Sequence, residues 1–357
     1  MAEIILVRHG KTAGNLEVHF IDVGQGDATL IKCDGHSMLI DAGNNDKGTL
    51  VQNYLQHQGV ETLDYVIGTH PDADHIGGMD VVLYKFDCKT IIMPDVANNT
   101  RTYDDVVQTM KNKGYKTTYP VVGETYTIGG AAFTIIAPNK EYGNDMNSWS
   151  VGVLLQNGNH RFLFTGDAEE GAEQDILQNG IDISADVYKV AHHGSNTATS
   201  QAFLDAVHPT YAVISAGEGN SYGHPHAEVL NRLRAAGVSV FRTDEQGTIV
   251  ASSDGTTLTW NMSPSESWQA GEAKKSQNTE KSEKAADSQN NAETDAAVSN
   301  PTDQTDGNSD VIVHITKTGE KYHSAGCQYL RKSDIEVTLS EAKARGLTPC
   351  SKCNPPQ

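Results

Sequence analysis

The sequence is poor in basic residues, and it contains no long apolar run. It holds 27 Lys and Arg against 46 Asp and Glu, which gives a formal net charge of −19. Such a surface repels polyphosphates and argues against a nonspecific coat for nucleic acid, although cations bound at a site offset the repulsion there. Because no stretch of about 18 apolar residues occurs, we predict no membrane span.

Cysteines are also few, and they do not form the even-numbered grid of a disulfide scaffold. Two of the five, Cys33 and Cys88, stand alone in apolar surroundings, where most cysteines are ordinary core residues. The other three gather near the C-terminus, at Cys327, Cys350 and Cys353. The close spacing of these three cysteines indicates a role other than packing in an apolar core.

Composition divides the chain into four segments, namely residues 1–15, 16–262, 263–310 and 311–357. The third is rich in Ser, Asn, Gln and charged residues, and it lacks the apolar area needed to offset its ordering entropy. We interpret it as a flexible acidic linker. The fourth returns to an ordered pattern, with a strand expected over 311–316 and a helix near 340–345.

The segment 16–262 alternates strand-like runs with helical patterns. Helices are expected over 50–58, 169–179, 200–207 and 227–236. Strands are expected over 17–22, 28–32, 37–41, 63–68, 91–93, 132–137, 151–156, 161–165, 248–252 and 257–260. Many strands with interspersed helices favour an α+β fold, a layered sandwich with the helices outside.

Four side chains of metal-binding type fall within six positions directly after the expected strand 63–68. They are His70, Asp72, Asp74 and His75, in the run Thr-His-Pro-Asp-Ala-Asp-His-Ile-Gly-Gly. A tight turn at a strand end can direct such side chains to one point. Hydrolysis at neutral pH needs a hydroxide and a place for developing negative charge, and two bridged divalent cations provide both.

More candidate ligands follow, each after an apolar strand-like run. They are Asp167, the pair His192–His193, and His224 with His226. Singly, each is more often a capping or buried polar residue. Their recurrence at strand ends is what a metal site in a layered fold requires.

These motifs occur in the order found in metallo-β-lactamase-fold hydrolases. Over about residues 17–262 the chain resembles the nuclease-like domain of ComEC-type competence proteins. The matching segments are 20–27 (Phe-Ile-Asp-Val-Gly-Gln-Gly-Asp), 39–43, 70–78, 164–167, 192–195 and 223–226. The resemblance implies a four-layer αββα sandwich with two divalent metals, usually zinc.

The resemblance also implies which residues bind these metals. Expected ligands of the first metal are His70, Asp72 and one member of the pair His192–His193. Expected ligands of the second are Asp74, His75 and His224, with Asp167 as the bridge. Asp74, His193 and His226 are expected to act in catalysis, one of the two histidines by protonating the leaving oxygen.

Two departures from the family pattern affect the first metal. Asp72 replaces a histidine that many members have at this position, a change common in the ComEC-like branch. The usual histidine before Asp167 is also absent, and residues 145–150 occupy that stretch. The first site is therefore richer in oxygen, and manganese is an alternative to zinc.

Residues 5–15 resemble the opening of the histidine phosphatases, in which a histidine such as His9 is phosphorylated and an arginine such as Arg8 holds the phosphate. That fold needs a domain of its own and a second, distant histidine. Because another pattern begins at residue 16, we interpret this segment as a spare strand or a foreign segment in place of a signal peptide.

Near the C-terminus, His323 and Cys327 are followed by the Cys-x2-Cys pair Cys350 and Cys353. This set suits one structural zinc ion, and a domain below about 50 residues usually needs such a staple. The segment resembles the small zinc-binding module of the Ada repair protein. A disulfide between Cys350 and Cys353, or free thiols, is the alternative.

Together these features predict a metal-dependent hydrolase, most plausibly a phosphodiesterase that cleaves DNA through a metal-bound hydroxide. The alternatives are a small-ester hydrolase, such as a phosphorylcholine esterase or a lactamase-like enzyme, and a non-catalytic surface-binding protein. The polar linker and the resemblance favour an extracellular or cell-surface location, although no export signal is recognised.

Overall fold

The computed structural model describes residues 13–271 and, near the C-terminus, residues 312–316, 321–324, 330, 335–344, 347–350 and 352–353. The chain divides into two compact units, Met1–Ser282 and Glu283–Gln357. None of the helices in the described ranges combines the length and apolar composition that crossing a membrane requires.

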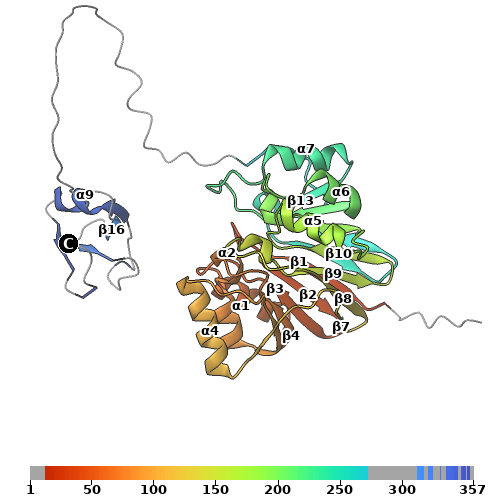
Figure 1. Ribbon diagram of the computed structural model, residues 1–357, viewed down its shortest axis with the longest axis horizontal. Coiled ribbons are helices and arrows are strands. Elements are labelled where there is room, and N and C mark those ends of the chain that lie inside the picture. The colour runs from red at the N-terminus through yellow and green to blue at the C-terminus, as the bar shows by residue number, and fades with distance from the viewer. Residues whose placement is uncertain are drawn as a thin grey trace, which may run out of the picture. The chain divides into compact units, whose positions relative to one another are not determined.

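Two β-sheets face each other in the first unit (Figure 1). The spatial order of the first is β15 (Leu258–Trp260), β14 (Ile249–Ser253), β1 (Leu16–Phe20), β2 (Thr29–Cys33), β3 (His36–Ile40), β4 (Thr62–Ile67), β5 (Asp87–Ile92) and β6 (Thr117–Thr118). The order of the second is β13 (Ser239–Arg242), β12 (Tyr211–Ile214), β11 (Val187–Lys189), β10 (His160–Phe164), β9 (Gly152–Asn157), β8 (Ala131–Ala137) and β7 (Thr125–Ile128).

Helices cover the outer face of each sheet. The first sheet carries α1 (Gly48–His57), α3 (Met79–Lys85) and α4 (Arg101–Lys113), and the second carries α5 (Glu170–Gln178), α6 (Gln201–Val207) and α7 (Ala227–Ala235). The short helices are α2 (Ala73–Ile76), α8 (Thr243–Gln246), η1 (Asn147–Trp149) and η2 (Ala191–Gly194). One apolar cluster lies between the sheets, and one lies under each helical layer. The predicted four-layer αββα sandwich is confirmed.

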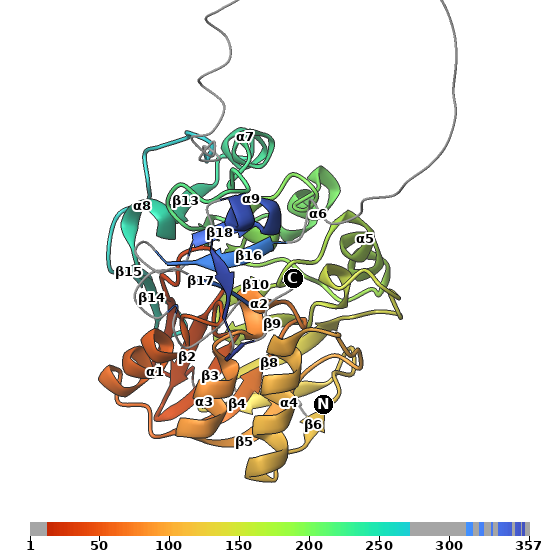
Figure 2. The ribbon, with the colours of Figure 1, turned by 90° about the vertical axis from the view of Figure 1, so that its left-hand side faces the viewer.

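Strand direction brings the candidate ligands to one edge of this sandwich. Strands β3, β4 and β5 run parallel in the first sheet, and β10, β11, β12 and β13 run parallel in the second. The loops that follow the carboxyl ends of parallel strands meet at one edge of a sheet, where ligands of layered folds bind. The helix α2, which follows β4 after the short loop that carries His70 and Asp72, lies at this edge, and Figure 2 views the domain from that side.

Close packing of backbone accounts for the glycines around α2. A Cβ atom on Gly78 would collide with the carbonyl oxygen of Ala42, and one on Gly26 would collide with that of Asp74. The N–H of Gly78 donates to the carbonyl of Gly43 at 2.9 Å, and the N–H of Asp27 donates to that of Asp74 at 3.0 Å. The loops after β1 and β3 therefore fix the backbone that carries Asp74 and His75.

Several parts of the main domain differ from the sequence-based expectation. The elements that were not expected are β6, β7, β11, β12, β13, α2, α3, α4 and α8. Of these, α4 is largely polar and buries only Thr102, Val106 and Met110 at four-residue spacing. Residues 263–271, interpreted as linker, pack on the domain. Trp268 joins the apolar cluster under α7, and the N–H of Gly271 donates to the carbonyl of Pro225 at 2.9 Å. A single large aromatic side chain supplies the burial that the polar composition concealed.

The second unit contains a small sheet with the order β18 (Ile335–Thr338), β16 (Ile312–Ile315), β17 (Lys321–His323) and β19 (Thr348–Pro349), and the helix α9 (Leu339–Ala344). Val313, Tyr322, Val337 and Leu339 belong to its apolar cluster. Ligand atoms of His323, Cys350 and Cys353 lie within 4.8 Å of one another. Cys327, the fourth expected ligand, lies outside the described residues, as do Arg8 and His9.

Candidate metal centre

Four side chains converge where the two sheets meet. Asp74, His75, Asp167 and His193 each offer a ligand atom, and these atoms lie within 4.8 Å of one another. One carboxylate links two of the histidines. Asp167 Oδ1 lies 3.1 Å from His75 Nε2, and Asp167 Oδ2 lies 3.4 Å from His193 Nε2. Asp74 Oδ2 lies 3.3 Å from the same His193 nitrogen.

The first two residues of the expected ligand run lie beside this group. His70 is fully buried, and its Nε2 lies 3.9 Å from Asp72 Oδ2. Asp72 is more open, with 39% of its side chain exposed, and its Oδ1 accepts a hydrogen bond from Asn98 Nδ2 at 3.3 Å. If His70 and Asp72 bind one metal ion, the exposed carboxylate of Asp72 leaves that ion accessible to solvent or substrate.

Hydrogen bonds to the far ring nitrogens hold three of these histidines. Asp41 Oδ2 accepts from His75 Nδ1 at 2.7 Å, and the carbonyl of Ser215 accepts from His193 Nδ1 at 3.0 Å. His70 Nδ1 lies 3.1 Å from the Thr69 hydroxyl. These contacts direct Nε2 of each ring towards the cluster, and partners of this kind orient metal-binding histidines.

Asp41 and Ser150 were not expected to have a role. Besides His75, Asp41 accepts from the N–H and the hydroxyl of Thr69, at 2.8 and 2.7 Å. Ser150 Oγ lies 3.3 Å from His70 Nδ1 and accepts from the N–H of Asp167 at 3.0 Å. Ser150 belongs to the stretch in which the family's usual histidine is missing. A hydroxyl that orients two candidate ligands thus occupies this stretch.

The histidines of the later motifs have different surroundings in the structure. The Nε2 of His192 lies 3.7 Å from Asp167 Oδ2, and its Nδ1 lies 3.2 Å from the Thr197 hydroxyl. That hydroxyl donates to Glu169 at 3.1 Å, so it accepts from His192. His193, and not His224, belongs to the tight group with Asp74 and His75, which differs from the grouping that the resemblance implied.

His224 also lines the site, but its Nδ1 accepts a hydrogen bond, whereas Nδ1 of His75 and Nδ1 of His193 each donate one. Gln25 Oε1 accepts from the N–H of Gly217 at 3.3 Å, which places Gln25 Nε2 at 3.4 Å from His224 Nδ1. Because an amide NH₂ only donates, Nδ1 accepts, and the proton of the neutral ring resides on Nε2. In this state Nε2 is a hydrogen-bond donor, and binding a metal there would require the proton to move to Nδ1. The expected ligand role of His224 stays a prediction.

His226 was expected to act in catalysis, and the structure does not bring it into the site. Its Nδ1 accepts from the N–H of Asn196 at 3.0 Å, and its Nε2 donates to the carbonyl of Tyr222 at 3.3 Å. Both ring nitrogens therefore bind backbone, one in the loop after η2 and the other in the loop before α7. In sequence, the pattern Gly-His-Pro-His cannot show which of its two histidines faces the cavity.

A buried ion pair lies behind the cluster. Lys189 Nζ is 2.9 Å from both carboxylate oxygens of Asp27, and the Lys189 side chain is only 3% exposed. Asp27 Oδ1 also lies 3.5 Å from His193 Nδ1. The pair connects the loop after β1 in one sheet to the end of β11 in the other. Sequence patterns gave no signal for Lys189, which stands in an apolar strand.

Backbone conformation at the cluster is unusual for residues with side chains. The φ angles of His192, His193 and Asp41 are 49°, 54° and 57°. This left-handed region costs roughly 1–3 kcal/mol for a non-glycine residue and is concentrated at functional sites. Two consecutive histidines in this conformation turn their side chains towards Asp167, which a regular strand end would not do.

The charges of the cluster shift its pKa values in both directions. Burial works against a charged His75, but the carboxylates of Asp167 and Asp41 outweigh it and raise the pKa of this histidine well above its usual range. Burial, and then the charge of His75, lower the pKa of His70 to about 3. Burial opposes the charged form of Asp74, but the hydrogen bond and charge from His193 and the charge of His75 lower its pKa to about 2. Charges gathered without screening solvent are typical of functional sites.

The donor set fits divalent metal ions. Nε2 of His70, His75 and His193 and Oδ1 of Asp167 are buried, and none makes a hydrogen bond of good geometry despite the carboxylates and imidazoles nearby. Buried polar atoms without partners are rare in folded proteins, and a group of them commonly marks the place of a bound ion. Imidazole nitrogens and carboxylate oxygens are the ligands that zinc and manganese accept. His70, Asp72, Asp74, His75, Asp167 and one or both of His192 and His193 would hold the ions.

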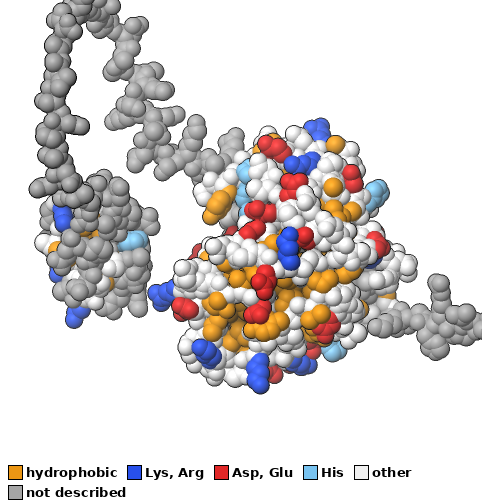
Figure 3. Space-filling model, in the orientation of Figure 1, with side chains coloured by type: hydrophobic (Ala, Val, Ile, Leu, Met, Phe, Trp, Pro, Cys, Tyr) orange, Lys and Arg blue, Asp and Glu red, His pale blue; other side chains and the backbone are white. Residues whose placement is uncertain are grey.

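A cavity of about 170 Å³ opens onto these residues. Gln25, Asn147 and Tyr222 complete its lining beside the ligand candidates and His224. Three carboxylates line it, and no Lys or Arg does. On the face of the domain seen in Figure 3, basic side chains are scattered among acidic ones and form no continuous patch. Apart from the histidines that would hold metal, positive charge for an anionic substrate at this cavity therefore has to come from bound ions.

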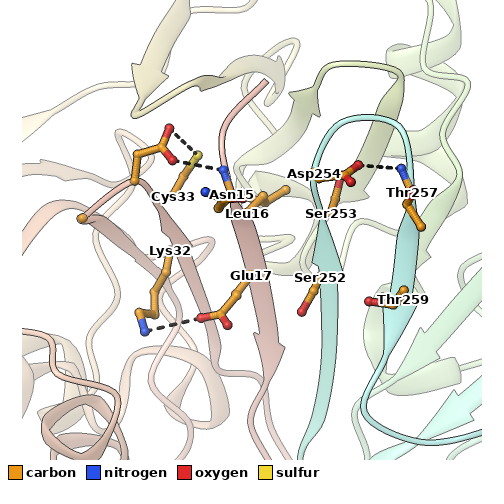
Figure 4. Close-up of a pocket in the computed structure, with 12 residues that line it drawn as sticks. Asn15, Leu16, Glu17, Lys32, Cys33, Ser252, Ser253, Asp254, Thr257 and Thr259 are labelled. Atoms are coloured by element: carbon orange, nitrogen blue, oxygen red, sulfur yellow. Dashed lines mark hydrogen bonds and ion pairs between the residues drawn. The ribbon is translucent and has the colours of Figure 1, made fainter. Parts of the chain in front are cut away.

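A larger cavity, of about 560 Å³, lies elsewhere, beside the start of β1 (Figure 4). Its polar groups are already paired: Glu17 faces Lys32 at 3.4 Å, and Asp254 accepts from the N–H of Thr257 at 2.7 Å. No histidine is among its lining residues. Size alone does not locate chemistry, and the smaller cavity is the one that meets the candidate ligands.

Comparison with known proteins agrees with this geometry. The family described as the Metallo-beta-lactamase superfamily matches residues 21–218, which is more than half of the chain. ComE operon protein 3 of Bacillus subtilis (strain 168) is 31% identical over 255 residues, covering 65% of this chain and 32% of that protein. Recombination protein 2 of Haemophilus influenzae is 33% identical over 238 residues, covering 65% and 28%, and competence protein ComA of Neisseria gonorrhoeae is 29% identical over 230 residues, covering 64% and 31%.

This chain thus spans about a third of the length of these curated relatives. Among solved structures, the metallo-beta-lactamase fold protein YhfI from Bacillus subtilis is 13% identical with a TM-score of 0.46, covering 69% of this chain and 99% of that one. Proteins of the matching superfamily are in general metal-dependent hydrolases. The chain therefore belongs to the metallo-beta-lactamase superfamily, and its main domain is of the type found in ComEC-like competence proteins.

Proposed function

We propose that this chain is a metal-dependent phosphodiesterase that cleaves DNA. The observation that carries the proposal is the convergence of buried histidine nitrogens and a shared carboxylate beside a cavity that no Lys or Arg lines. Such a donor set suits hydrolysis assisted by two divalent cations, zinc or manganese. The similarity to competence and recombination proteins supports DNA as the substrate.

When bound, the metal ions would supply an activated water molecule and positive charge for the extra charge on phosphorus. The remaining work falls to side chains of this chain. Asp41, Ser215 and Ser150 keep the ligand histidines in place through hydrogen bonds. Preorganised ligands of this kind spare the reaction the cost of ordering them.

His224 is the side chain that we propose to act on the leaving group. It faces the cavity, and Gln25 keeps its proton on Nε2. Burial, and then the charges of His193 and His192, lower the pKa of His224 to about 4, so the ring is neutral at pH 7. A neutral Nε2–H donates a hydrogen bond to the departing oxygen and stabilises its growing charge.

Metal-loaded protein should cleave DNA in an assay that offers duplex and single-stranded forms side by side. Asp167→Ala should abolish cleavage, because it removes the carboxylate that links His75 and His193. Asp46→Ala is the matched control, since Asp46 is an exposed carboxylate outside the cavity lining. DNA that stays intact while a small phosphodiester is cleaved rapidly would refute the nuclease proposal and favour the small-ester alternative.

We also propose one structural zinc ion in the second unit. Cys353 Sγ lies 3.8 Å from His323 Nδ1, and the N–H of Cys350 donates to the carbonyl of Tyr322 at 2.9 Å. This hydrogen bond places the Cys-x2-Cys turn beside the strand that carries His323. Thiolates and imidazole gathered in a small domain are typical of a structural zinc site.

A further inference from the structure

An exposed aromatic side chain stands at the mouth of the metal cavity. Tyr222 lines this cavity, yet 64% of its surface is exposed. The described residues leave five other large apolar or aromatic side chains exposed, namely Leu50, Tyr84, Tyr119, Val121 and Ile335, and none of these lines the cavity. An exposed aromatic ring at a site is a common feature of surfaces that bind a partner.

The loop between β12 and α7 holds the backbone of Tyr222 firmly. The buried Asn220 accepts from the N–H of Tyr222 at 3.1 Å and from that of His224 at 3.0 Å. The same side chain donates to the carbonyl of Gly217 at 2.9 Å. From the other side, His226 Nε2 donates to the carbonyl of Tyr222 at 3.3 Å. The ring is therefore positioned before any ligand arrives, and little ordering entropy is lost on binding.

His224 orients the ring of Tyr222, while the hydroxyl of Tyr222 plays no part in the fold of the described residues. The Tyr222 ring stacks on that of His224, with centroids 5.5 Å apart and planes 21° from parallel. Within the described part of the chain, the Tyr222 hydroxyl makes no hydrogen bond. A tyrosine that was needed only for the fold would bury its ring or pair its hydroxyl, and Tyr222 does neither.

Aromatic stacking is the contact that the lining of this cavity can offer to the organic part of a substrate. Its lining carries three carboxylates and no Lys or Arg, so it offers the backbone phosphates of a nucleic acid no ion pair with a lysine or arginine. Every nucleobase has a π-face, and stacking on an aromatic side chain tolerates any sequence. Bases inside a duplex already stack on one another, so only an unpaired base can reach such a ring.

We propose that Tyr222 is a stacking platform for an unpaired nucleobase that flanks the scissile phosphodiester. The inference rests on the proposed phosphodiesterase function and narrows its substrate to single-stranded DNA or frayed ends. In this arrangement His224, beneath the ring, contacts the phosphodiester, and Tyr222 holds the adjacent base. Asn220 and His226 are positioning residues that hold the platform.

A double-mutant cycle between protein and substrate tests the platform. A short single-stranded oligodeoxynucleotide is compared with a series in which one nucleotide at a time is abasic. For the wild type, the abasic change beside the cleaved bond should lower kcat/KM about 5- to 150-fold, as expected for one stacked base. Tyr222→Ala should show a loss of similar size with the intact oligonucleotide and almost no further loss with the abasic one. Tyr222→Phe, which keeps the aromatic ring, should restore the difference between the intact and the abasic oligonucleotide.

Tyr84→Ala is the matched control, because Tyr84 is 65% exposed and lies on α3, outside the cavity lining. It should leave all rates unchanged. Equal losses on the intact and abasic oligonucleotides in Tyr222→Ala would overturn the platform, since the ring would then act through the fold of the loop.

A binding assay distinguishes failure of the stacking platform from failure of the proposed phosphodiesterase function. Anisotropy of a fluorescent oligonucleotide should show weaker binding to Tyr222→Ala, and no difference between intact and abasic strands in that variant. If metal-loaded wild-type protein cleaves no phosphodiester but this binding pattern holds, the proposed function fails and the platform stands. If cleavage occurs but intact and abasic strands bind the wild type equally, the platform fails alone.

Discussion

Replacing Lys189 by methionine should destabilise the main domain strongly, although Lys189 is not a candidate ligand. Its Nζ lies 2.9 Å from both carboxylate oxygens of Asp27, and only 3% of the lysine side chain is exposed. Methionine keeps the volume of the lysine stem but leaves the Asp27 carboxylate buried without its main partner. Breaking a buried pair in this way costs about 3–5 kcal/mol, because the remaining charge stays desolvated.

The double variant Asp27→Asn with Lys189→Met should recover most of this loss. It removes both charges while keeping the side chains similar in shape, and such replacements of buried pairs are often neutral. Urea unfolding followed by tryptophan fluorescence measures the effect, since all three tryptophans, Trp149, Trp260 and Trp268, lie in the main domain. A loss of this size is a large part of the roughly 5–15 kcal/mol that typically holds a domain together.

An exposed pair provides the comparison. Lys140 Nζ lies 2.7 Å from Asp175, but 58% of the lysine side chain is exposed. Lys140→Met should therefore cost less than about 1 kcal/mol. If Lys189→Met costs no more than Lys140→Met, or if the two single changes at the buried pair simply add, the pair is solvated and the reasoning is wrong.

Four further predictions concern the site and the second unit. Chelation should lower the melting temperature of the main domain, and restoring metal at about 100 times its Kd should return about 2.7 kcal/mol; an unchanged transition would show that no ion is bound. His224→Ala should slow cleavage about 10²- to 10⁴-fold for diesters with poor leaving groups and much less for p-nitrophenyl esters; equal losses would show that the ring does not act on the leaving oxygen. Cys350→Ser should release one zinc ion per chain in metal analysis while DNA cleavage by the main domain persists; no loss of zinc would favour a disulfide or free thiols. Because no Lys or Arg lines the cavity, kcat/KM for DNA should fall by less than about tenfold between about 50 and 200 mM salt, far less than for a protein with roughly 6–10 phosphate contacts.

Local sequence patterns identified the ligand run because the chemistry is dense there. Four ligand-type side chains within six positions after an apolar strand seldom occur outside metal sites, and the parallel strands bring the later motifs to the same edge. The patterns could not show which of His192 and His193, or which of His224 and His226, faces the site. These choices depend on the far ring nitrogen of each histidine, and its partners come from other loops.

Supporting residues were harder to predict, since their signal is three-dimensional. Lys189 reads as an ordinary strand residue, and only its position opposite Asp27 in the other sheet gives it a role. Tyr222 belongs to a polar loop, where an aromatic residue alone predicts nothing. The helix α4 was missed because three buried side chains in thirteen residues leave a weak apolar period.

If the proposed function holds, this acidic protein cleaves an acidic polymer and needs positive charge only where the phosphate binds. Two of the buried carboxylates at this site are already compensated within the chain: Asp27 faces Lys189, and Asp41 faces His75. Of the three that line the cavity, Asp74 and Asp167 face the imidazoles of His75 and His193, which carry an extra proton only while no metal occupies their Nε2 atoms. Two divalent cations would replace these protons and outweigh the three carboxylates, while the rest of the surface stays acidic. In the proposed function, substrate would then be attracted to the site, and a base stacked on Tyr222 would supply the contact that a basic groove otherwise provides.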